Sequence, residues 1–573
     1  MRPRANPLVT RFDYVIVGAG SAGCVIANRL TEDPDVSVLL LEAGGADTQF
    51  YYRLALGFHS WRYPQTNWAY ESEPEPHLNG RRIPLPRGKV LGGSSTMNAM
   101  LYSRGHPRDY DHWRGLGCEG WGYSDVLPYF RRSETNWRGE GPYHGGTGPL
   151  KVSAINTRKR LHEPVMAAAR LLGYPTTDDH HGRMHEGFGR GDTTTTARGR
   201  RSSASKAYLD PIRSRPNLSI VPDALVTRVL MAGGRATGVM VRTQGVEREL
   251  HADREVILAG GVYNTPQLLM LSGVGPADHL REVGIAPVVE LPGVGRNLSE
   301  HAGYWIDFET SGPVSLLKEL RFDKVVLATL QWAVFGKGLL ASQVNSAHAE
   351  IRSVAGLSQP DLQMYFNPVR PDAKPWFPGI GQRQQHRINA VICLLNPQSR
   401  GWTELRSSDP TAKPRITLNL MATARDRDTL VRSVKMVREI YDTPPLRQLI
   451  AREVLPGPQV RTDAQIEAYL RNALITTHHS VGTCRMGHDA ASVVDPELKV
   501  HGVAGLRVCD ASIMPTVPGG NTNAPAIMIG EKAADLIRGR RLTPAAVPID
   551  EPPPRAARTP TENPQVQALL NAD

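Results

Sequence analysis

The sequence predicts an α/β fold, α+β overall, that contains a Rossmann-like lobe, and the start of the chain carries this prediction. Residues 14–17 form a short apolar run, rich in β-branched side chains, that is typical of a buried strand. The run ends in Gly18-x-Gly20-x-x-Gly23 and continues into a helical pattern with one apolar face. Glycines at this spacing allow a tight turn, a close approach of the backbone to a pyrophosphate, and close packing of the helix on the strand.

An acidic residue at the end of the next predicted strand completes this pattern. Residues 37–41 form a second apolar run that leads into Glu42, about 20 residues after the last glycine, where an acid that binds a ribose is expected. The helix N-terminus directs unpaired N–H groups at the phosphates. A glycine-rich turn without a ligand is the alternative, and the order strand, glycines, helix, strand and acid disfavours it. We therefore predict a dinucleotide site that includes Gly18, Gly20, Ser21, Gly23 and Glu42.

Composition limits the class of protein. The 573 residues are enough for two or more lobes, and 40% hydrophobic with 21% charged residues is ordinary for a soluble enzyme. No apolar run is long enough to span a bilayer. The net charge is +11, but acids are interleaved with the basic residues, so nucleic-acid binding is not predicted. Five widely spaced cysteines argue against a disulfide framework and favour a reducing, cytoplasmic location.

A second loop of small residues follows the first motif. Gly92, Gly93 and Ser94 form a loop whose backbone can approach a flat or anionic ligand and donate N–H groups to it. Asn98 supplies a neutral amide with both donor and acceptor atoms. Alone, this loop is equally consistent with a hinge, and it gains meaning only beside the first motif.

Longer stretches resemble a known family. Residues 87–113, RGKVLGGSSTMNAMLYSRGHPRDYDHW, resemble the first signature of the glucose–methanol–choline (GMC) oxidoreductases, which are flavoproteins. Residues 260–275, GGVYNTPQLLMLSGVG, are similar to the second signature, with Val262 where alanine is more usual. NWAYESEPEP and GWGYSDVLPYFRRSE look like the choline-dehydrogenase-like branch. The likeness runs from Phe12 to about Gly539 and implies that the dinucleotide is FAD.

The resemblance also implies a division into lobes. Residues 11–303, together with 476–541, are expected to form a discontinuous FAD-binding lobe with a loop-rich insertion near 139–216. Residues 304–475 are expected to form the substrate-binding lobe, built on an antiparallel sheet flanked by helices. Residues 542–573 are rich in proline and poor in aromatic residues, and we expect a flexible tail.

Apolar runs predict further elements within these lobes. We expect an amphipathic helix over residues 425–442. The strands are expected at residues 218–221, 224–231, 236–241, 255–259, 362–366, 390–395 and 401–405.

The family pattern extends the cofactor site toward the C-terminus. Asp510 follows a predicted strand and, by resemblance, contacts the sugar-alcohol and phosphate region of the flavin. Asn523 is expected to cap a helix whose positive end lies near the flavin pyrimidine. The expected FAD-binding residues are Gly18, Gly20, Ser21, Gly23, Glu42, Gly92, Gly93, Ser94, Asn98, Val226, Asp510, Asn521 and Asn523. Some relatives bind FAD covalently through a histidine at the position of Met97, so noncovalent FAD is expected here.

Two residues are expected to carry the chemistry. THHSVGTCRMG, residues 477–487, resembles the segment that contains the catalytic histidine, and the V-G-T that follows places His479 at that position. A histidine can accept an alcohol proton near neutral pH. Asn521 stands where relatives have a second catalytic residue, His or Asn, and an amide can bind the substrate oxygen but cannot act as a base. The roles of His478 and of Glu350, in the motif HAE, are left open.

The resemblance implies oxidation of an alcohol, expected to be primary, to an aldehyde. His479 would take the hydroxyl proton and the carbinol hydrogen would leave as a hydride to flavin N5. The electron acceptor is oxygen or a quinone-like compound, and the alcohol is not defined. Two alternatives remain: a flavoprotein of the same fold with non-oxidative or light-driven chemistry, and a basic binding protein that has lost catalysis.

Two groups of residues raise the possibility of a metal site. The first is His180, His181 and His185, and the second is Cys484, His488 and Cys509. Neither group has the paired spacing of a metal motif, so no metal site is predicted.

Overall fold

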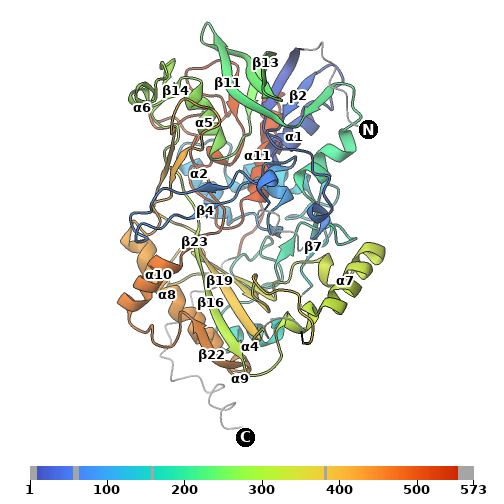
Figure 1. Cartoon of the computed structure of the whole chain (residues 1–573), viewed down its shortest axis with the longest axis vertical. Helices are drawn as coiled ribbons and strands as arrows, with labels where there is room; N and C mark the ends of the chain where they lie inside the picture. The colour runs from blue at the N-terminus through green and yellow to red at the C-terminus, as the bar shows by residue number, and fades with distance from the viewer. Residues whose placement is uncertain (1–9, 56–62, 157–160, 380–383, 551, 553–573) are drawn as a thin grey trace.

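The computed structural model describes residues 10–55, 63–156, 161–379, 384–550 and 552. Two seven-stranded sheets lie toward opposite ends of the long axis of the molecule (Figure 1). Each sheet has its own large cluster of buried apolar side chains. The chain forms most of the first sheet, then the second, and returns to the first near its C-terminal end.

The first sheet combines parallel and antiparallel strands in the order β10-β2-β1-β13-β12-β11, with β24 also paired to β13. The strands β10, β2, β1, β13 and β24 run parallel, whereas β11 pairs antiparallel with β12 and β12 pairs antiparallel with the first half of β13. The strands are β1 (Arg11–Val17), β2 (Val38–Leu41), β10 (Leu218–Val221), β11 (Ala224–Ala232), β12 (Arg235–Thr243), β13 (Val246–Leu258) and β24 (Leu506–Val508).

Helices cover the parallel strands, which explains their continuous apolar runs. All four residues of β2 are buried. Helix α1 (Ser21–Leu30) packs along α11 (Asn523–Ile537), and Arg29 forms an ion pair at 2.8 Å with the buried carboxylate of Glu531. Gly530 permits the contact, because a Cβ there would lie 2.8 Å from the backbone of α1. Two helices that are far apart in the sequence are therefore held together.

The second sheet is antiparallel throughout and has the order β22-β16-β19-β18-β17-β8, with β23 also paired to β16. Helices α4 (His162–Leu171), α8 (Ala424–Tyr441), α9 (Leu446–Leu449) and α10 (Asp463–Ala473) contribute to its apolar core. The strands are β8 (Gly187–Gly189), β16 (Ala302–Thr310), β17 (Ala347–Ile351), β18 (Leu362–Asn367), β19 (Arg387–Leu394), β22 (Ile450–Leu455) and β23 (Ile475–Thr476).

Smaller elements connect the two sheets. The remaining α-helices are α2 (Pro107–Gly115), α3 (Tyr123–Ser133), α5 (Asn264–Leu271), α6 (Ala277–Glu282) and α7 (Phe322–Phe335). The small sheets contain β3 (Tyr70–Glu71) and β4 (Pro84–Leu85), β14 (Val274–Gly275) and β15 (Val289–Glu290), β20 (Trp402–Glu404) and β21 (Arg415–Thr417), and β5 (Leu101–Tyr102), β6 (Glu134–Asn136), β7 (Leu150–Ala154) and β9 (Asp192–Thr193). Short helical turns include η4 (Gly93–Thr96), η7 (Leu316–Leu320), η8 (Leu339–Ala341) and η9 (Ala511–Ile513).

The predicted fold class is confirmed, and most predicted strands are present with slightly different bounds. The largest difference is β13, which begins at Val246 and not near residue 255. Its first half is mostly exposed and pairs with β12 as a hairpin, so it lacks the apolar run that marks a buried strand. The predicted helix over 425–442 is α8.

The second sheet includes a strand from outside the predicted substrate-binding lobe. Strand β8 lies in the predicted insertion, residues 139–216, yet it pairs with β17 of the second sheet. The limits of the lobes therefore stay a prediction. Of the predicted tail, residues 551 and 553–573 lie outside the described residues. The tail begins in contact with the protein, since the backbone N–H of Ala545 donates to the Ser124 carbonyl at 2.8 Å.

A search of the described residues for membrane-spanning helices gave none that combines the required length with the required hydrophobicity.

Candidate active site

A cavity runs along the carboxyl ends of β1, β2 and β13, where α/β sheets bind ligands, and it reaches a histidine and an asparagine from the C-terminal part of the chain. Twelve of the residues predicted from the sequence line it: Gly18, Gly20, Ser21, Glu42, Gly93, Ser94, Asn98, Val226, His479, Asp510, Asn521 and Asn523. The two other predicted residues, Gly23 and Gly92, lie directly behind this lining and shape it.

Two glycines of the turn after β1, Gly18 and Gly23, have no room for a side chain. Gly18 has φ +101, and a Cβ there would lie 2.5 Å from the carbonyl oxygen of Ala259. A Cβ on Gly23 would lie 2.0 Å from the carbonyl oxygen of Gly18, so only glycine lets α1 pack this closely on the strand. The tight turn and the close packing predicted for this motif are both present.

The second glycine loop packs directly on the first. The N–H of Gly92 donates to the carbonyl of Ala19 at 2.8 Å, and a Cβ on Gly93 would lie 2.8 Å from Cα of Gly20. Helix α1 has no side-chain cap at its N-terminus. Its first N–H groups and its positive end are therefore open to the cavity, as binding of a pyrophosphate requires.

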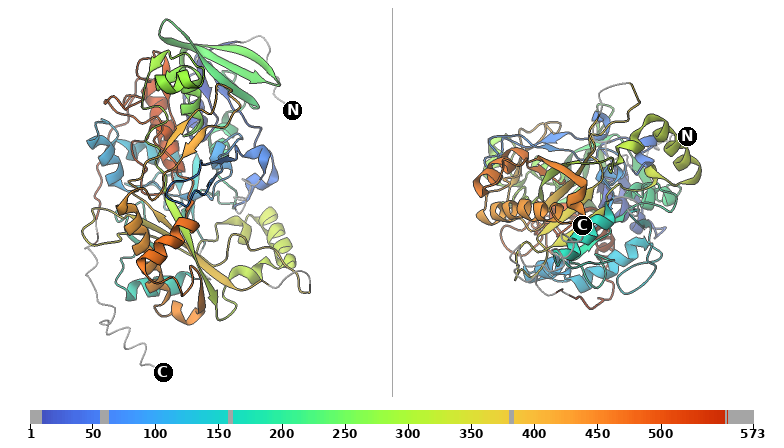
Figure 2. Two further views of the ribbon diagram at one scale, coloured as in Figure 1. Left: turned by 60° about the vertical axis from the view of Figure 1, so that its left-hand side comes forward. Right: turned by 90° about the horizontal axis from the view of Figure 1, so that it is seen from below.

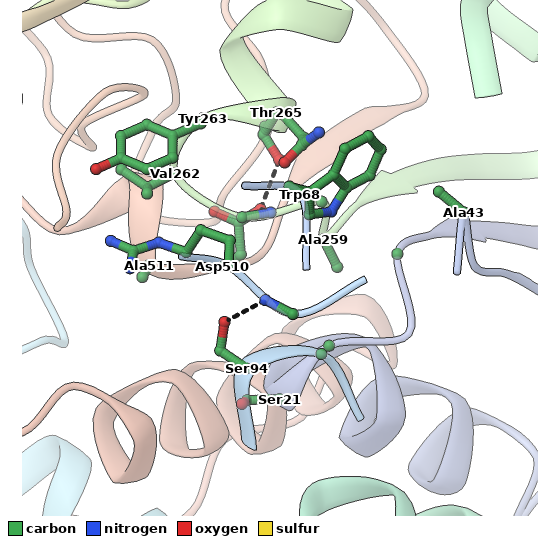
Figure 3. A pocket seen from close by; sticks show the side chains of 18 of the residues that line it. Ser21, Ala43, Trp68, Ser94, Ala259, Val262, Tyr263, Thr265, Asp510 and Ala511 are labelled. Carbon is green, nitrogen blue, oxygen red and sulfur yellow. Dashed lines mark hydrogen bonds between the residues drawn. The ribbon is translucent and has the colours of Figure 1, made fainter. Parts of the chain in front are cut away.

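The two glycine loops and the N-terminus of α1 form a cradle for the cofactor. A buried carboxyl group lies on each side of this cradle. Glu42 accepts backbone N–H groups from Ala19 at 3.0 Å and Gly44 at 2.9 Å, and burial raises its pKa to about 7. Asp510 follows β24 and accepts from the Gly261 N–H at 2.9 Å. Figure 3 shows its second bond, from the Thr265 hydroxyl at 2.6 Å, on the side of the pocket opposite Ser21 and Ser94. Both carboxyl groups are fixed before any ligand binds.

Two helix N-termini meet at the cavity. The Ser21 hydroxyl, at the start of α1, donates to Oδ1 of Asn523 at 2.8 Å. The prediction that Asn523 caps α11 is wrong: it is the first helical residue, Thr522 is at the N-cap, and neither supplies a side-chain cap. Its amide instead joins the two helices. The Asn98 side-chain oxygen accepts from Arg201 at 2.9 Å, which fixes the loop that carries it.

The pairing of β23 with β16 builds the catalytic end of the cavity. In this register Ala302 lies opposite Thr476, which places His301 beside the segment that carries His479. Nδ1 of His301 lies 3.0 Å from Nδ1 of His479. On the other side of the His479 ring, Nε2 lies 2.9 Å from the side-chain nitrogen of Asn521. The predicted histidine and asparagine thus meet, and His301 is a neighbour that sequence reasoning missed.

Hydrogen bonds determine which nitrogen of His479 carries the proton. Nε2 of His301 lies 2.8 Å from the carbonyl oxygen of Leu395, which only accepts, so this nitrogen carries hydrogen. Burial lowers the pKa of His301 to about 4, so its Nδ1 is an acceptor. The hydrogen between the two rings therefore belongs to Nδ1 of His479. Nε2 of His479 is left without a hydrogen and has a lone pair that can accept one, which is the form a base needs.

Hydrogen bonds extend from His479 through Asn521, Tyr365 and Gln363 to Glu350. Because Nε2 of His479 accepts, Asn521 turns its NH₂ toward it and its oxygen toward the hydroxyl of Tyr365, 2.8 Å away. The Tyr365 hydroxyl also lies 2.6 Å from the side-chain oxygen of Gln363, so it faces two acceptors. The side-chain nitrogen of Gln363 donates to the Glu350 carboxyl at 3.0 Å.

Burial favours the uncharged forms of the titratable groups at both ends of this network. Glu350 is buried, and burial raises its pKa to about 8, with Asp109 contributing in the same direction. Its neighbour His348, 3.5 Å away, supplies no charge because burial lowers its pKa well below the usual value. Burial, with smaller effects of His301, His478 and Arg87, holds the pKa of His479 well below its usual range. An uncharged carboxyl group, Glu350, and an uncharged imidazole, His479, are therefore favoured at the two ends of the hydrogen-bond network.

The residues that sequence reasoning missed are positioned by contacts distant in the sequence. Tyr365 stands opposite His348 in the β17–β18 register, and their rings stack at 5.0 Å. Glu300 accepts the N–H of His479 at 2.7 Å. No local signal identifies Tyr365. His301 could have been noticed only as a histidine at the end of the conspicuous segment LPGVGRNLSEH.

The histidines and cysteines considered for metal binding are buried or dispersed. The structure describes no group of three or more His, Cys, Asp or Glu residues arranged to hold a metal ion. Nε2 of His181 lies 3.2 Å from the carbonyl of Tyr102, and Nδ1 of His180 lies 3.3 Å from that of His185. The five cysteines are free and buried.

A Rossmann-like sheet whose ligand cavity ends on a buried neutral histidine defines a dinucleotide-dependent oxidoreductase. Family models described as GMC oxidoreductase match residues 12–303 and 397–530. The chain belongs to the GMC oxidoreductase family.

Sequence identity and structural similarity to individual proteins support this family membership. The oxygen-dependent choline dehydrogenase of Burkholderia thailandensis is 46% identical over 538 residues, which are 92% of this chain and 94% of that protein. Among solved structures, pyridoxine 4-oxidase from Mesorbium loti has a TM-score of 0.83 at 29% identity and covers 93% of this chain and 100% of its own. A formate oxidase variant from Aspergillus oryzae has a TM-score of 0.86 at 28% identity, with coverages of 93% and 98%.

The protein is therefore an FAD-dependent oxidoreductase that acts on the CH–OH group of an alcohol. The comparisons favour neither the non-oxidative alternative nor the binding protein without catalysis. The cradle fits FAD: the glycine turns leave room for the pyrophosphate, Glu42 stands at the end of β2 for the ribose, and Asp510 stands at the end of β24. FAD is bound noncovalently, and Met97, which lines the cavity, has no nitrogen that could form a bond to it.

We expect denaturation to release the flavin. When purified protein is precipitated with acid or heat, the yellow colour should pass into the supernatant and be identified there as FAD by chromatography, because Met97 cannot form the histidyl bond of some relatives. Flavin that stays with the precipitated chain would contradict noncovalent binding.

We expect the rate of flavin reduction by alcohol to change little between pH 7.5 and pH 6. His479 has a lowered pKa, so it stays neutral as the pH falls through this range. A histidine with an unperturbed pKa of about 6.5 would lose about fourfold in rate over the same interval. The measurement is anaerobic stopped-flow at saturating alcohol, and a fourfold or larger decrease would show that the pKa is not lowered.

Proposed function

We propose that His479 and Asn521 act together in the oxidation of a small primary alcohol to an aldehyde. The observation that carries the proposal is the 2.9 Å contact between Nε2 of His479 and the side-chain nitrogen of Asn521. Both side chains line the cavity that contains the dinucleotide cradle. A hydroxyl that replaces this direct contact meets a proton acceptor and a hydrogen-bond donor at once.

His479 acts as the base through Nε2. Its lone pair takes the hydroxyl proton, and the ring becomes positive while Nδ1 keeps its hydrogen bond to His301. Glu300, which accepts the backbone N–H of His479 at 2.7 Å, holds the segment in place. The Thr477 hydroxyl oxygen, 3.0 Å from Nδ1, gives that N–H a second acceptor.

Asn521 positions the alcohol oxygen. Its NH₂ group donates to that oxygen and stabilises the negative charge that develops as the proton leaves. Tyr365 donates to the Asn521 oxygen at 2.8 Å, which prevents the amide from turning over. Bound FAD supplies the hydride acceptor. The side chains of His479 and Tyr365 are buried, so the groups that hold the alcohol work with little competing water.

The electron acceptor and the location of the protein are finer parts of the proposal. Oxygen is supported by the relatives that are named oxygen-dependent dehydrogenases or oxidases, and a quinone-like compound is the second candidate. Five free, buried cysteines support the predicted cytoplasmic location.

We expect uncharged primary alcohols to be better substrates than choline. The relatives named choline dehydrogenases make choline the reference compound, but burial raises the pKa of Glu350 to about 8, which favours its uncharged form at neutral pH and weakens the attraction of a quaternary ammonium. Anaerobic bleaching of the flavin absorbance by choline and by uncharged alcohols of similar size measures the preference. Bleaching by choline at much lower concentration than by the uncharged alcohols would overturn it.

We expect His479→Ala to slow reduction of the flavin by about 10²–10⁴-fold, the usual contribution of a general base, without loss of the cofactor. Stopped-flow reduction and the flavin-to-protein absorbance ratio measure the two effects. His488→Ala is the matched control because His488 is exposed and lies outside the cavity. Near-normal reduction by His479→Ala would require a different base.

A further inference from the structure

Helix α7 presents an unusual surface to solvent. Six of its large apolar side chains are exposed: Phe322 59%, Val326 44%, Leu327 66%, Leu330 57%, Val334 70% and Phe335 68%. Among its fourteen residues only Trp332 is buried. A surface helix of a globular protein normally turns its apolar side chains inward and its polar ones outward. Here the apolar side chains form the outer face, which we call the α7 face.

The helix is fixed in this orientation at both ends. The backbone N–H of Phe322 donates to the Trp376 carbonyl at 2.8 Å, and the Trp332 indole donates to the Gly199 carbonyl at 2.7 Å. Gly336 ends the helix in the left-handed conformation, and a Cβ there would lie 2.5 Å from the carbonyl of Arg198. Rotation of the α7 face toward the protein would break these contacts. Figures 1 and 2 show α7 at the periphery of the molecule in every view.

The α7 face exposes more large apolar side chains than any other element of the described residues. Elsewhere in the described residues, exposed large apolar side chains occur one or two to an element, as is normal. A contiguous apolar patch on a fixed helix indicates a surface that binds another protein or a membrane. At fourteen residues, α7 is too short to span a bilayer, but it has the length and apolar face of a helix that lies in the plane of the membrane interface.

The charged side chains around the α7 face indicate what covers it. Exposed Lys318 and Lys337 flank the helix, and exposed Arg198 and Arg200 lie in the loop packed against its C-terminal end. The acids of this segment are balanced, since Asp323 pairs with Arg321 at 2.6 Å and Glu319 with Lys324 at 3.5 Å. An excess of positive charge around an apolar face suits anionic lipid headgroups. It opposes a second copy of the chain, because like charges would meet across that interface.

We propose that the α7 face docks on the surface of an anionic lipid bilayer. The apolar side chains enter the boundary between headgroups and acyl chains, and the basic side chains contact the phosphates.

Docking at this point places the bilayer near the cofactor cavity. After η8, the side chain of Gln343 donates to the carbonyl of Ala99, which lines the cavity next to Asn98. Arg201, two residues after the Gly199 that binds Trp332, donates to Asn98 at 2.7 Å. The helix and the cavity margin are therefore joined by short, direct contacts. An apolar alcohol or a quinone-like acceptor dissolved in the bilayer would have a short path to the site.

The test is flotation of the purified, FAD-loaded full chain with vesicles made of equal parts phosphatidylglycerol and phosphatidylcholine. We expect the protein to float with these vesicles and about tenfold less with pure phosphatidylcholine, with partial release at high salt. Leu327→Glu, Leu330→Glu and Val334→Glu combined should lower binding by at least about tenfold, because charged side chains do not enter the interface. Lys318→Glu with Lys337→Glu should weaken binding to the anionic vesicles specifically.

Val288→Glu is the matched control, since Val288 is 59% exposed but lies far from α7 in the sequence, before β15. It should leave vesicle binding unchanged. Flavin content and melting temperature show whether each variant is folded. Should the triple variant not fold, the two lysine substitutions and the salt dependence decide the question alone.

Three results would overturn the proposal. The first is no flotation of the wild-type chain. The second is equal flotation of wild type and the triple variant. The third is a dimer, seen by light scattering without lipid, that the triple variant converts to a monomer, which would assign the α7 face to contact between two copies.

Discussion

The direction of one hydrogen bond, from Nε2 of His301 to the carbonyl of Leu395, determines the proton positions across the active site. Leu395 directly follows β19, and its backbone N–H donates to the Asp361 carbonyl at 2.9 Å, which holds the backbone in place; its own carbonyl can only accept. The constraint passes to His479, whose unprotonated Nε2 makes it a base, and on to Asn521 and Tyr365. The site is thus arranged by backbone geometry before any substrate enters it.

The two sheets supply different parts of this arrangement. The first supplies the parallel strands whose carboxyl ends, together with the N-termini of α1 and α11, form the cofactor cradle. The second supplies His301, at the start of β16, and Tyr365, on β18. His479 joins the two parts, because β23 pairs with β16 and the chain then returns to the first sheet. Substrate and cofactor can meet only where both sheets contribute side chains.

The sequence predicts those parts of the site that depend on neighbouring residues. The turn from Gly18 to Gly23 and the acid Glu42 form a local pattern, and each lies where that pattern requires. The network of Tyr365 and Glu350 could not be predicted, because it depends on the β17–β18 register between segments with no local mark. The α7 face was equally hidden, since an apolar helical pattern does not distinguish a buried face from an exposed one.

The pairing of β24 with β13, and of α11 with α1, has a consequence for biosynthesis. Residues 506–537 complete both the sheet and the cradle, so the coenzyme site is incomplete during synthesis until this segment has been translated. A chain that stops before residue 506 lacks part of the site. Incorporation of the coenzyme therefore reports that this segment has been made and has folded onto the first sheet.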